Sequence, residues 1–153
     1  MKLLVPIDGS DTSLRAIDTL LAKLGAYRPP VEVHLINVQH ALRKDVGQFV
    51  DHDEIRGYHQ EEGMKALAPA RARLDAAGVT YTPHVFVGEA AEVIVQFASE
   101  QGVGEIIMGS HNRSELAQLL LGSVAQQVIH AAQAAVLVVR TPMETRIGKQ
   151  GAQ

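Results

Sequence analysis

The sequence predicts a doubly wound α/β fold, in which a five-stranded parallel sheet ordered 3-2-1-4-5 carries helices on both faces. Short apolar runs rich in Val, Ile and Leu occur at residues 3–7, 31–38, 81–87, 105–108 and 135–139. Apolar residues at helical spacing fill the intervals between the runs. Runs that are apolar throughout suit strands buried on both faces, and right-handed crossovers leave few other topologies for them.

Length and composition indicate one globular domain. The chain has 153 residues, 46% of them hydrophobic, so we expect a domain over residues 1–141 and a flexible tail over 142–153. Its 14 Lys and Arg against 17 Asp and Glu give a net charge of −3 without a basic run, which argues against nucleic acid or a membrane as partner. The lack of cysteine, of a signal-peptide core and of a membrane-length apolar run favours a cytoplasmic protein.

The first run contains Pro6, which conflicts with a place at the centre of the sheet. A proline has no N–H to donate to a neighbouring strand. We therefore expect Pro6 at the carboxyl end of the first strand, where the pairing between strands frays.

The first helix is predicted directly after this strand. Its apolar positions follow helical spacing at Leu14, Ile17, Leu20, Leu21 and Leu24. Ser10, Asp11 or Thr12 can serve as N-cap, and Gly25 is the expected stop.

A second helix is predicted over residues 53–77, and it is interrupted by unfavourable residues. Gly57, Gly63 and Pro69 weaken the pattern, and Gly78 supplies the stop. Because Pro69 removes an N–H and clashes with the preceding turn, we expect a kink there or a break into two segments.

Two further helices are predicted in the second half of the chain. The third carries Val93, Ile94, Phe97 and Ala98 on one face, has Glu89 and Glu92 near its start and ends at Gly102. The fourth begins at Gly122 and Ser123 and shows Val124, Val128, Ile129 and Ala132 at helical spacing.

The expected ligand site lies at the carboxyl ends of the strands. In an open parallel sheet the ligand crevice forms where the strand order reverses, here between strands one and four. Strand one brings Pro6, Ile7 and Asp8 to that crevice, and strand four brings the segment from Met108 to Asn112. Topology alone thus predicts that two segments roughly 100 residues apart converge.

Glycines on both sides of the crevice indicate a phosphate clamp. Gly109 and Gly122 would let the backbone approach a phosphate closely, and the helix beginning at Ser123 would aim N–H groups at it. The Ser123 hydroxyl would donate to a phosphate oxygen or bind a phosphate-held Mg²⁺. The alternative is that Gly109 only makes a turn and that Ser123 only caps a helix.

Two strand ends offer groups for the rest of a nucleotide. Asp8 would accept a ribose hydroxyl or face a metal; alternatively, it accepts in an Asx-turn or caps the first helix. Val38, which closes the second strand, would offer its backbone N–H and C=O to an adenine edge, whereas its side chain fits the core.

Several other phosphate-binding and catalytic signatures are absent from the sequence. It has no Gly-x-x-x-x-Gly-Lys-Ser/Thr loop, no Gly-x-Gly-x-x-Gly turn and no Gly-x-Ser-x-Gly elbow. Its seven histidines lack His-x-x-x-His or His-Glu-x-x-His spacing, so we expect no metal site built from side chains.

Six segments carry a resemblance to a known family. They are Val5-Pro6-Ile7-Asp8-Gly9-Ser10, Leu35-Ile36-Asn37-Val38, Gly88-Glu89-Ala90, Ile106-Ile107-Met108-Gly109-Ser110-His111 with Leu120-Leu121-Gly122-Ser123-Val124, and Val136-Leu137-Val138-Val139. In order and spacing the chain resembles the single-domain universal stress proteins of the UspA type over nearly its whole length.

The ATP-binding members of that family carry Gly-x2-Gly-x9-Gly-Ser/Thr. Gly109 matches the first glycine, and Gly122 and Ser123 match the final pair with the spacing intact. Asn112 stands where the second glycine belongs. Asn tolerates a left-handed turn best among non-glycine residues, although its side chain would crowd a phosphate or replace a phosphate oxygen as acceptor.

The resemblance implies an adenine nucleotide site. It would be lined by Pro6, Asp8, Val38, Gly109, Gly122, Ser123 and Val124, to which the topology adds Ile7 and Met108. Arg113 would add positive charge towards the phosphates, the alternative being a solvated loop cation.

Our leading hypothesis is a stress-response regulatory protein that binds ATP, with or without Mg²⁺. Two alternatives are a slow ATPase, for which Asp8 and His111 are candidate bases, and a nucleotide-free dimeric interaction module. We also expect a homodimer through the last strand, because it forms an apolar sheet edge; the resemblance points the same way. That edge comprises Ala135, Val136, Leu137, Val138 and Val139.

Overall fold

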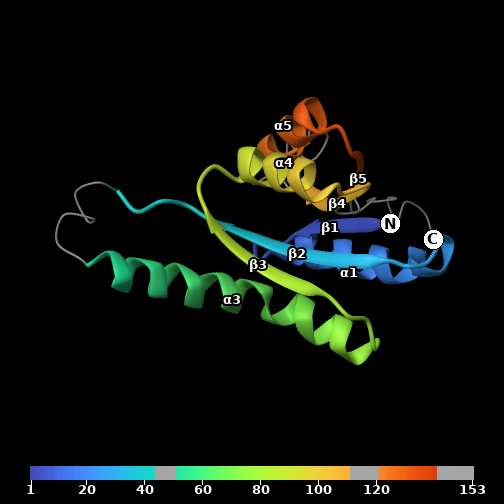
Figure 1. Cartoon of the computed structure of the whole chain (residues 1–153), viewed down its shortest axis with the longest axis horizontal. Coiled ribbons are helices and arrows are strands. Elements are labelled where there is room, and N and C mark those ends of the chain that lie inside the picture. The colour runs from blue at the N-terminus through green and yellow to red at the C-terminus, as the bar shows by residue number, and fades with distance from the viewer. Residues whose placement is uncertain (44–50, 111–120, 141–153) are drawn as a thin grey trace, which may run out of the picture.

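A computed structural model describes residues 1–43, 51–110 and 121–140 of the chain. Its sheet has five parallel strands in the order β3-β2-β1-β4-β5, which confirms the predicted topology (Figure 1). The strands are β1 (Lys2–Pro6), β2 (Glu32–Gln39), β3 (Thr82–Val87), β4 (Glu105–Ser110) and β5 (Ala135–Arg140). The tail expected over residues 142–153 lies outside the described residues.

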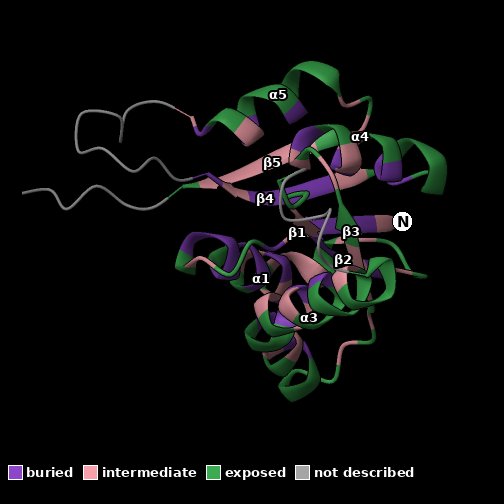
Figure 2. Ribbon diagram, turned by 90° about the vertical axis from the view of Figure 1, so that its left-hand side faces the viewer, coloured by how far each residue is buried: buried purple, intermediate pink, exposed green. Residues whose placement is uncertain are grey.

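Helices cover both faces of the sheet. They are α1 (Asp11–Lys23) with a short 3₁₀ turn η1 (Leu24–Ala26) after it, α3 (His52–Ala76), α4 (Ala90–Gln101) and α5 (Ser123–Ala131). Helices α1 and α3 lie against one face, and α4 and α5 lie against the other (Figure 2). None of the described helices has the length and apolarity needed to cross a bilayer.

Two separate cores explain why the strands are apolar throughout. Successive side chains of a strand point to opposite faces. Leu3 and Val5 therefore pack with α1 and α3, whereas Leu4 of the same strand packs with α4 and α5. Ile106 and Ile107 divide in the same way along β4, and each is fully buried.

Helix α3 runs without a break from His52 to Ala76, so of the two outcomes predicted at Pro69, a kink or a break, the break is wrong. Pro69 is exposed, as is Lys65 four residues before it. The proline ring therefore points to solvent, and the Lys65 carbonyl that loses its helical donor can bond to water. An exposed proline is compatible with a helix whose opposite face, with Leu67, Ala70 and Leu74, is fully buried.

Pro6 ends the pairing between β1, the central strand, and its neighbour β4. The Ile7 N–H donates to the Ile36 carbonyl at 2.8 Å, so the odd-numbered residues of this segment face β2 and Pro6 faces β4. On the β4 side the recorded pairs are Leu3 with Glu105 and Leu4 with Ile106. Because Pro6 has no N–H for the next bond, β1 and β4 are unpaired at the carboxyl edge of the sheet. The position predicted for Pro6 is confirmed.

Candidate functional site

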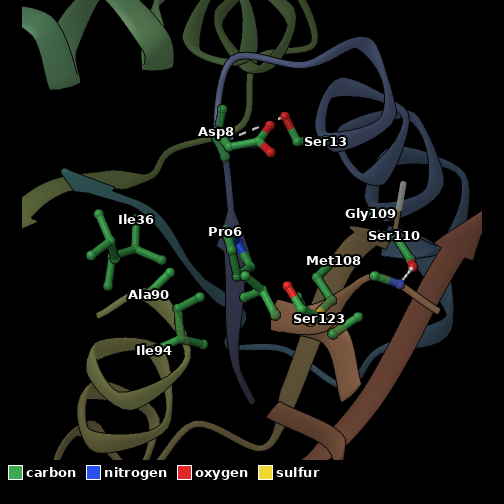
Figure 3. Close-up of a pocket in the computed structure, with 15 residues that line it drawn as sticks. Pro6, Asp8, Ser13, Ile36, Ala90, Ile94, Met108, Gly109, Ser110 and Ser123 are labelled. Carbon is green, nitrogen blue, oxygen red and sulfur yellow. Dashed lines mark hydrogen bonds between the residues drawn. The ribbon is translucent and has the colours of Figure 1, made fainter. Parts of the chain in front are cut away.

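A pocket opens at the carboxyl edge, where β1 and β4 are unpaired. It has a volume of about 410 Å³, within the range of about 300–1,000 Å³ common for small-molecule sites. Its lining comprises Pro6, Ile7, Asp8, Ser13, Ile36, Val38, Ala90, Ile94, Met108, Gly109, Ser110, Gly122, Ser123, Val124 and Ala125. Figure 3 shows Ile36, Ala90 and Ile94 across the pocket from Ser110 and Ser123, which gives it an apolar side and a polar side.

The turn after β1 is held by hydrogen bonds of Asp8. The carboxylate atom Oδ1 accepts from the Ser10 N–H at 2.8 Å. The Asp8 N–H donates to the Ser13 hydroxyl at 3.4 Å, as Figure 3 shows. Gly9 between them has a φ of +88°, a conformation that favours glycine. The Asx-turn interpretation of Asp8 therefore holds, and the same residue lines the pocket.

The backbone of Val38 faces the gap beyond the end of β1. The Gln39 carbonyl accepts from the Gly88 N–H at 2.9 Å, so the backbone groups of the odd-numbered residues at this end of β2 point towards β3. Backbone groups alternate in direction along a strand, and the N–H and C=O of Val38 therefore point to the opposite side. In the described part of the chain neither group has a recorded hydrogen bond. Val38 thus presents a donor and an acceptor side by side at the pocket.

Gly109 is required by helix packing. A Cβ atom built on it would lie 2.6 Å from the carbonyl oxygen of Thr12 and 2.9 Å from the backbone nitrogen of Ser13, both in the first turn of α1. The sequence suggested that this glycine lets the backbone approach a phosphate. The structure instead places the first turn of α1 on its Cβ side, so the close approach there is to protein backbone.

Ser110 connects the two halves of the predicted clamp. Its hydroxyl oxygen accepts from the Gly122 N–H at 2.7 Å, and Ser110 is only 8% exposed. The bond joins the last residue of β4 to the N-cap of α5. It fixes the start of α5 against the strand from which the Gly109 segment comes.

The start of α5 has no side-chain cap. Its N-cap is Gly122, which has no side chain that could accept from the first turn. The first N–H groups of a helix have no acceptor within the helix, and those of Ser123, Val124 and Ala125 have none among the residues that the structure describes. These three residues line the pocket. The arrangement is a donor cluster suited to an anion.

Capping differs between the two faces of the sheet. Helix α1 is capped by the Ser10 side chain and α3 by that of Asp51. Helices α4 and α5, whose first residues Ala90 and Ser123 line the pocket, begin at Glu89 and Gly122 without a side-chain cap. A helix N-terminus carries partial positive charge, which Glu89 and Glu92 offset at α4, whereas the first turn of α5 holds no acidic residue; the pocket is therefore bordered by one positive helix end without an acidic side chain, that of α5.

The structure brings nine of the eleven predicted site residues to this one pocket. They are Pro6, Ile7, Asp8, Val38, Met108, Gly109, Gly122, Ser123 and Val124. Asn112 and Arg113, with the alternative base His111, lie outside the described residues. The prediction missed Ser13, Ile36, Ala90, Ile94, Ser110 and Ala125. The signal for Ile36 was available, since it lies two residues before Val38 and so on the same face of β2.

Comparison with known proteins gives one consistent family. The model of the universal stress protein family matches residues 1–140. Universal stress protein YxiE of Bacillus subtilis is 33% identical over 147 residues, which cover 91% of this chain and 98% of that protein.

Two solved structures are similar over nearly their whole length. The structure of MJ0577 from Methanocaldococcus jannaschii has a TM-score of 0.75 and 32% identity, with 92% of this chain and 96% of that chain covered. A universal stress protein in complex with cAMP has a TM-score of 0.69 and 25% identity, with 93% and 98% covered.

Proposed function

Because the chain belongs to the universal stress protein family, we propose that it is a stress-response regulatory protein that binds ATP in the pocket between β1 and β4. A related structure of this family holds an adenine nucleotide, cAMP, which supports the ligand class. The observation that carries the proposal is the uncapped start of α5 opening into the pocket.

The phosphates would bind at the start of α5. The N–H groups of Ser123, Val124 and Ala125 need acceptors that the helix does not provide, and phosphate oxygens are strong acceptors. The Ser123 hydroxyl would add a further donor or a ligand for Mg²⁺ held by the phosphates. Anion binding there would also compensate the positive end of the helix dipole.

The adenine base would bind on the apolar side of the pocket. Ile36, Ala90 and Ile94 supply apolar contacts for the ring, and Val38 supplies a backbone N–H beside a C=O. Adenine carries a ring nitrogen acceptor next to its amino group, a pattern complementary to that pair. Asp8, which lines the pocket, would accept from a ribose hydroxyl through its carboxylate.

The ligand assignment is tested by mass spectrometry and by one pair of variants. Protein purified without added nucleotide should retain ATP when analysed by native mass spectrometry. Retained ADP would favour the ATPase alternative, and empty protein that also fails to bind millimolar ATP would favour the interaction module.

The variants Ser123→Pro and Ser123→Ala separate the backbone N–H from the hydroxyl. Proline is well tolerated at the first position of a helix, and Gly122 before it has φ −61° and ψ 155°, which suits a residue preceding proline. Ser123→Pro should bind ATP about tenfold more weakly than Ser123→Ala, because it also removes one phosphate N–H. Equal affinity of the two variants, measured by calorimetry at matched free energy of unfolding, would exclude α5 as the phosphate site.

A homodimer through β5 is the second part of the proposal. The Ala135 N–H donates to the Gly104 carbonyl beside β4, so Val136 and Val138 direct their backbone groups outward from the sheet. On the opposite edge, Pro83 lies at an outward position of β3 and interrupts the row of donors there. The β5 edge is therefore better suited to pair with a second copy of the chain.

A further inference from the structure

We propose that Asn37 is a positioning residue, which keeps the backbone of Val38 unpaired and open to the adenine base. The inference rests on the proposed function, because it assigns a role only when Val38 contacts a ligand. It concerns a side chain that does not line the pocket and that points towards the end of β1.

The hydrogen-bond ladder between β1 and β2 stops one bond short of what the parallel register would allow. Their register ends at Pro6 with Ile36, and the Ile7 N–H still donates to the Ile36 carbonyl at 2.8 Å. In a parallel pair the next bond would run from the Val38 N–H to the Ile7 carbonyl. Among the described residues that bond is not formed.

The side chain of Asn37 takes the place of that bond. Its Nδ2 donates to the Ile7 carbonyl at 2.8 Å. Ile7 is 2% exposed, so its carbonyl would otherwise be a buried acceptor without a donor. Asn37 thus satisfies Ile7 while the Val38 N–H remains available.

The orientation of the Asn37 amide is fixed on both sides. A carbonyl oxygen only accepts, so the nitrogen of the amide must face Ile7. On the other side Asn37 Oδ1 accepts from Gln39 Nε2 at 2.7 Å. Asn37 is 3% exposed, and a buried amide with both ends bonded holds one conformation.

Removal of the Asn37 amide should allow the missing hydrogen bond between β1 and β2 to form. Without Nδ2, the donor that the parallel register offers to the Ile7 carbonyl is the Val38 N–H. That bond would take from the pocket the donor proposed for the adenine ring nitrogen. The variants are Asn37→Leu and the smaller Asn37→Ala, neither of which has a donor; the alanine variant serves where the leucine variant does not fold.

Amide hydrogen exchange of Val38 in the nucleotide-free protein tests the ladder directly. Exchange in the wild type should be fast, and in the Asn37 variants it should slow by about tenfold or more, because a ladder bond protects an amide. Gln39→Leu is the matched control: it removes the other hydrogen bond of Asn37 and leaves the donor to Ile7, so Val38 exchange should stay fast.

Nucleotide analogues test the consequence for binding. 1-Deaza-ATP and 7-deaza-ATP each lack one ring nitrogen beside the amino group of adenine. In calorimetry, one of them should bind the wild type up to about tenfold more weakly than ATP does, the effect of one lost hydrogen bond. In the Asn37 variants ATP should bind as weakly as that analogue, and the difference between the two should vanish. A merely structural role of Asn37 would keep the difference.

The outcomes separate the two proposals. Unchanged Val38 exchange in both Asn37 variants overturns the inference even if the wild type binds ATP. A wild type that does not bind ATP overturns the proposed function, and with it the ligand role of Asn37, even if the variants still protect the Val38 amide.

Discussion

The hydroxyl oxygen of Ser110 accepts a hydrogen bond from the backbone N–H of Gly122 at 2.7 Å. Ser110→Ala should leave that N–H without an acceptor and loosen the start of α5. We expect ATP binding to weaken by about 1–1.5 kcal/mol, roughly tenfold. Calorimetric titration with Mg·ATP measures this change. Ser110→Thr keeps the oxygen and serves as control; equal binding by the alanine variant would show that the bond does not position α5.

Gly109→Ala tests whether this glycine is needed by the fold. The new methyl group would lie 2.6 Å from the Thr12 carbonyl oxygen, too close for either backbone to remain in place. We expect the free energy of unfolding to fall by about 1–3 kcal/mol in urea titrations without ligand. Gly25→Ala is the control, because its added methyl has no neighbour within 4 Å. A Gly109→Ala protein as stable as the wild type would mean that α1 can move away from β4.

Asn112 decides how closely the chain follows the ATP-binding sequence pattern. Asn112→Gly should tighten ATP binding by about 0.5–2 kcal/mol, because glycine removes the crowding and the conformational cost expected of asparagine at that position. Gly122→Val should abolish binding by crowding the start of α5. Calorimetry at millimolar ATP measures both. If neither the wild type nor Asn112→Gly binds, the dimeric interaction module becomes the better explanation.

Val138→Lys tests the proposed dimer. Val138 belongs to the edge strand β5, and its side chain is partly buried against the core beneath α4 and α5, so a lysine there would disturb the strand that pairs with a second chain. Sedimentation at micromolar concentration should show a shift towards monomer. The same substitution at the exposed Ile129 of α5 is the control. A dimer that persists in Val138→Lys would place the interface elsewhere.

Stability below neutral pH should depend on a histidine pair. Nδ1 of His34 lies 3.0 Å from Nε2 of His84, so one ring must donate and the other accept. Burial, and next the neighbouring His34, lower the pKa of His84 below its ordinary value of 6.5. The unfolded chain therefore takes up a proton near pH 6.5 that the folded chain does not, and the stabilisation present above this pH is lost as the pH falls below it.

The measurement is the free energy of unfolding in urea at pH 7.5 and pH 5.5. His84→Gln should reduce the loss between these two conditions. The variant loses the packing of Phe86 and Phe97 against the His84 ring at both pH values, whereas Glu32 Oε2, which lies 3.8 Å from His34 Nε2, stays in place. His130→Gln, at an exposed position of α5, is the control. An equal loss in wild type and His84→Gln would show that other groups set the acid sensitivity.

The fold was predictable because a strand that is buried on both faces of the sheet is apolar throughout, a pattern that is easily read from the sequence. Leu3, Leu4 and Val5 are consecutive, and they fill two cores from one strand, so the run is apolar without alternation. The position of Pro6 followed from its missing N–H alone. The break at Pro69 was predicted wrongly, because its tolerance depends on the exposure of one helix face, which a local sequence rule does not contain.

The site was predictable where topology brings strand ends together. Asp8, Val38 and Gly109 each lie near the carboxyl end of a strand or just beyond it, and these ends meet where the strand order reverses. Ser110 and Asn37 were missed as participants because their roles are single hydrogen bonds to residues 12 and 30 positions away. Polar side chains of this kind have no periodicity, so their partners become visible only in three dimensions.

Pro83 has a consequence for how far copies of this chain can assemble. A sheet with two open edges can pair at both, and repeated pairing of that kind produces a filament without end. Here one edge, β3, has its row of outward N–H groups interrupted at Pro83, whereas the β5 edge has no proline. If two chains pair symmetrically through β5, the β5 edge of each chain is covered by the other. Assembly then stops at the dimer. A single proline on the far edge thus favours a closed particle over a fibre.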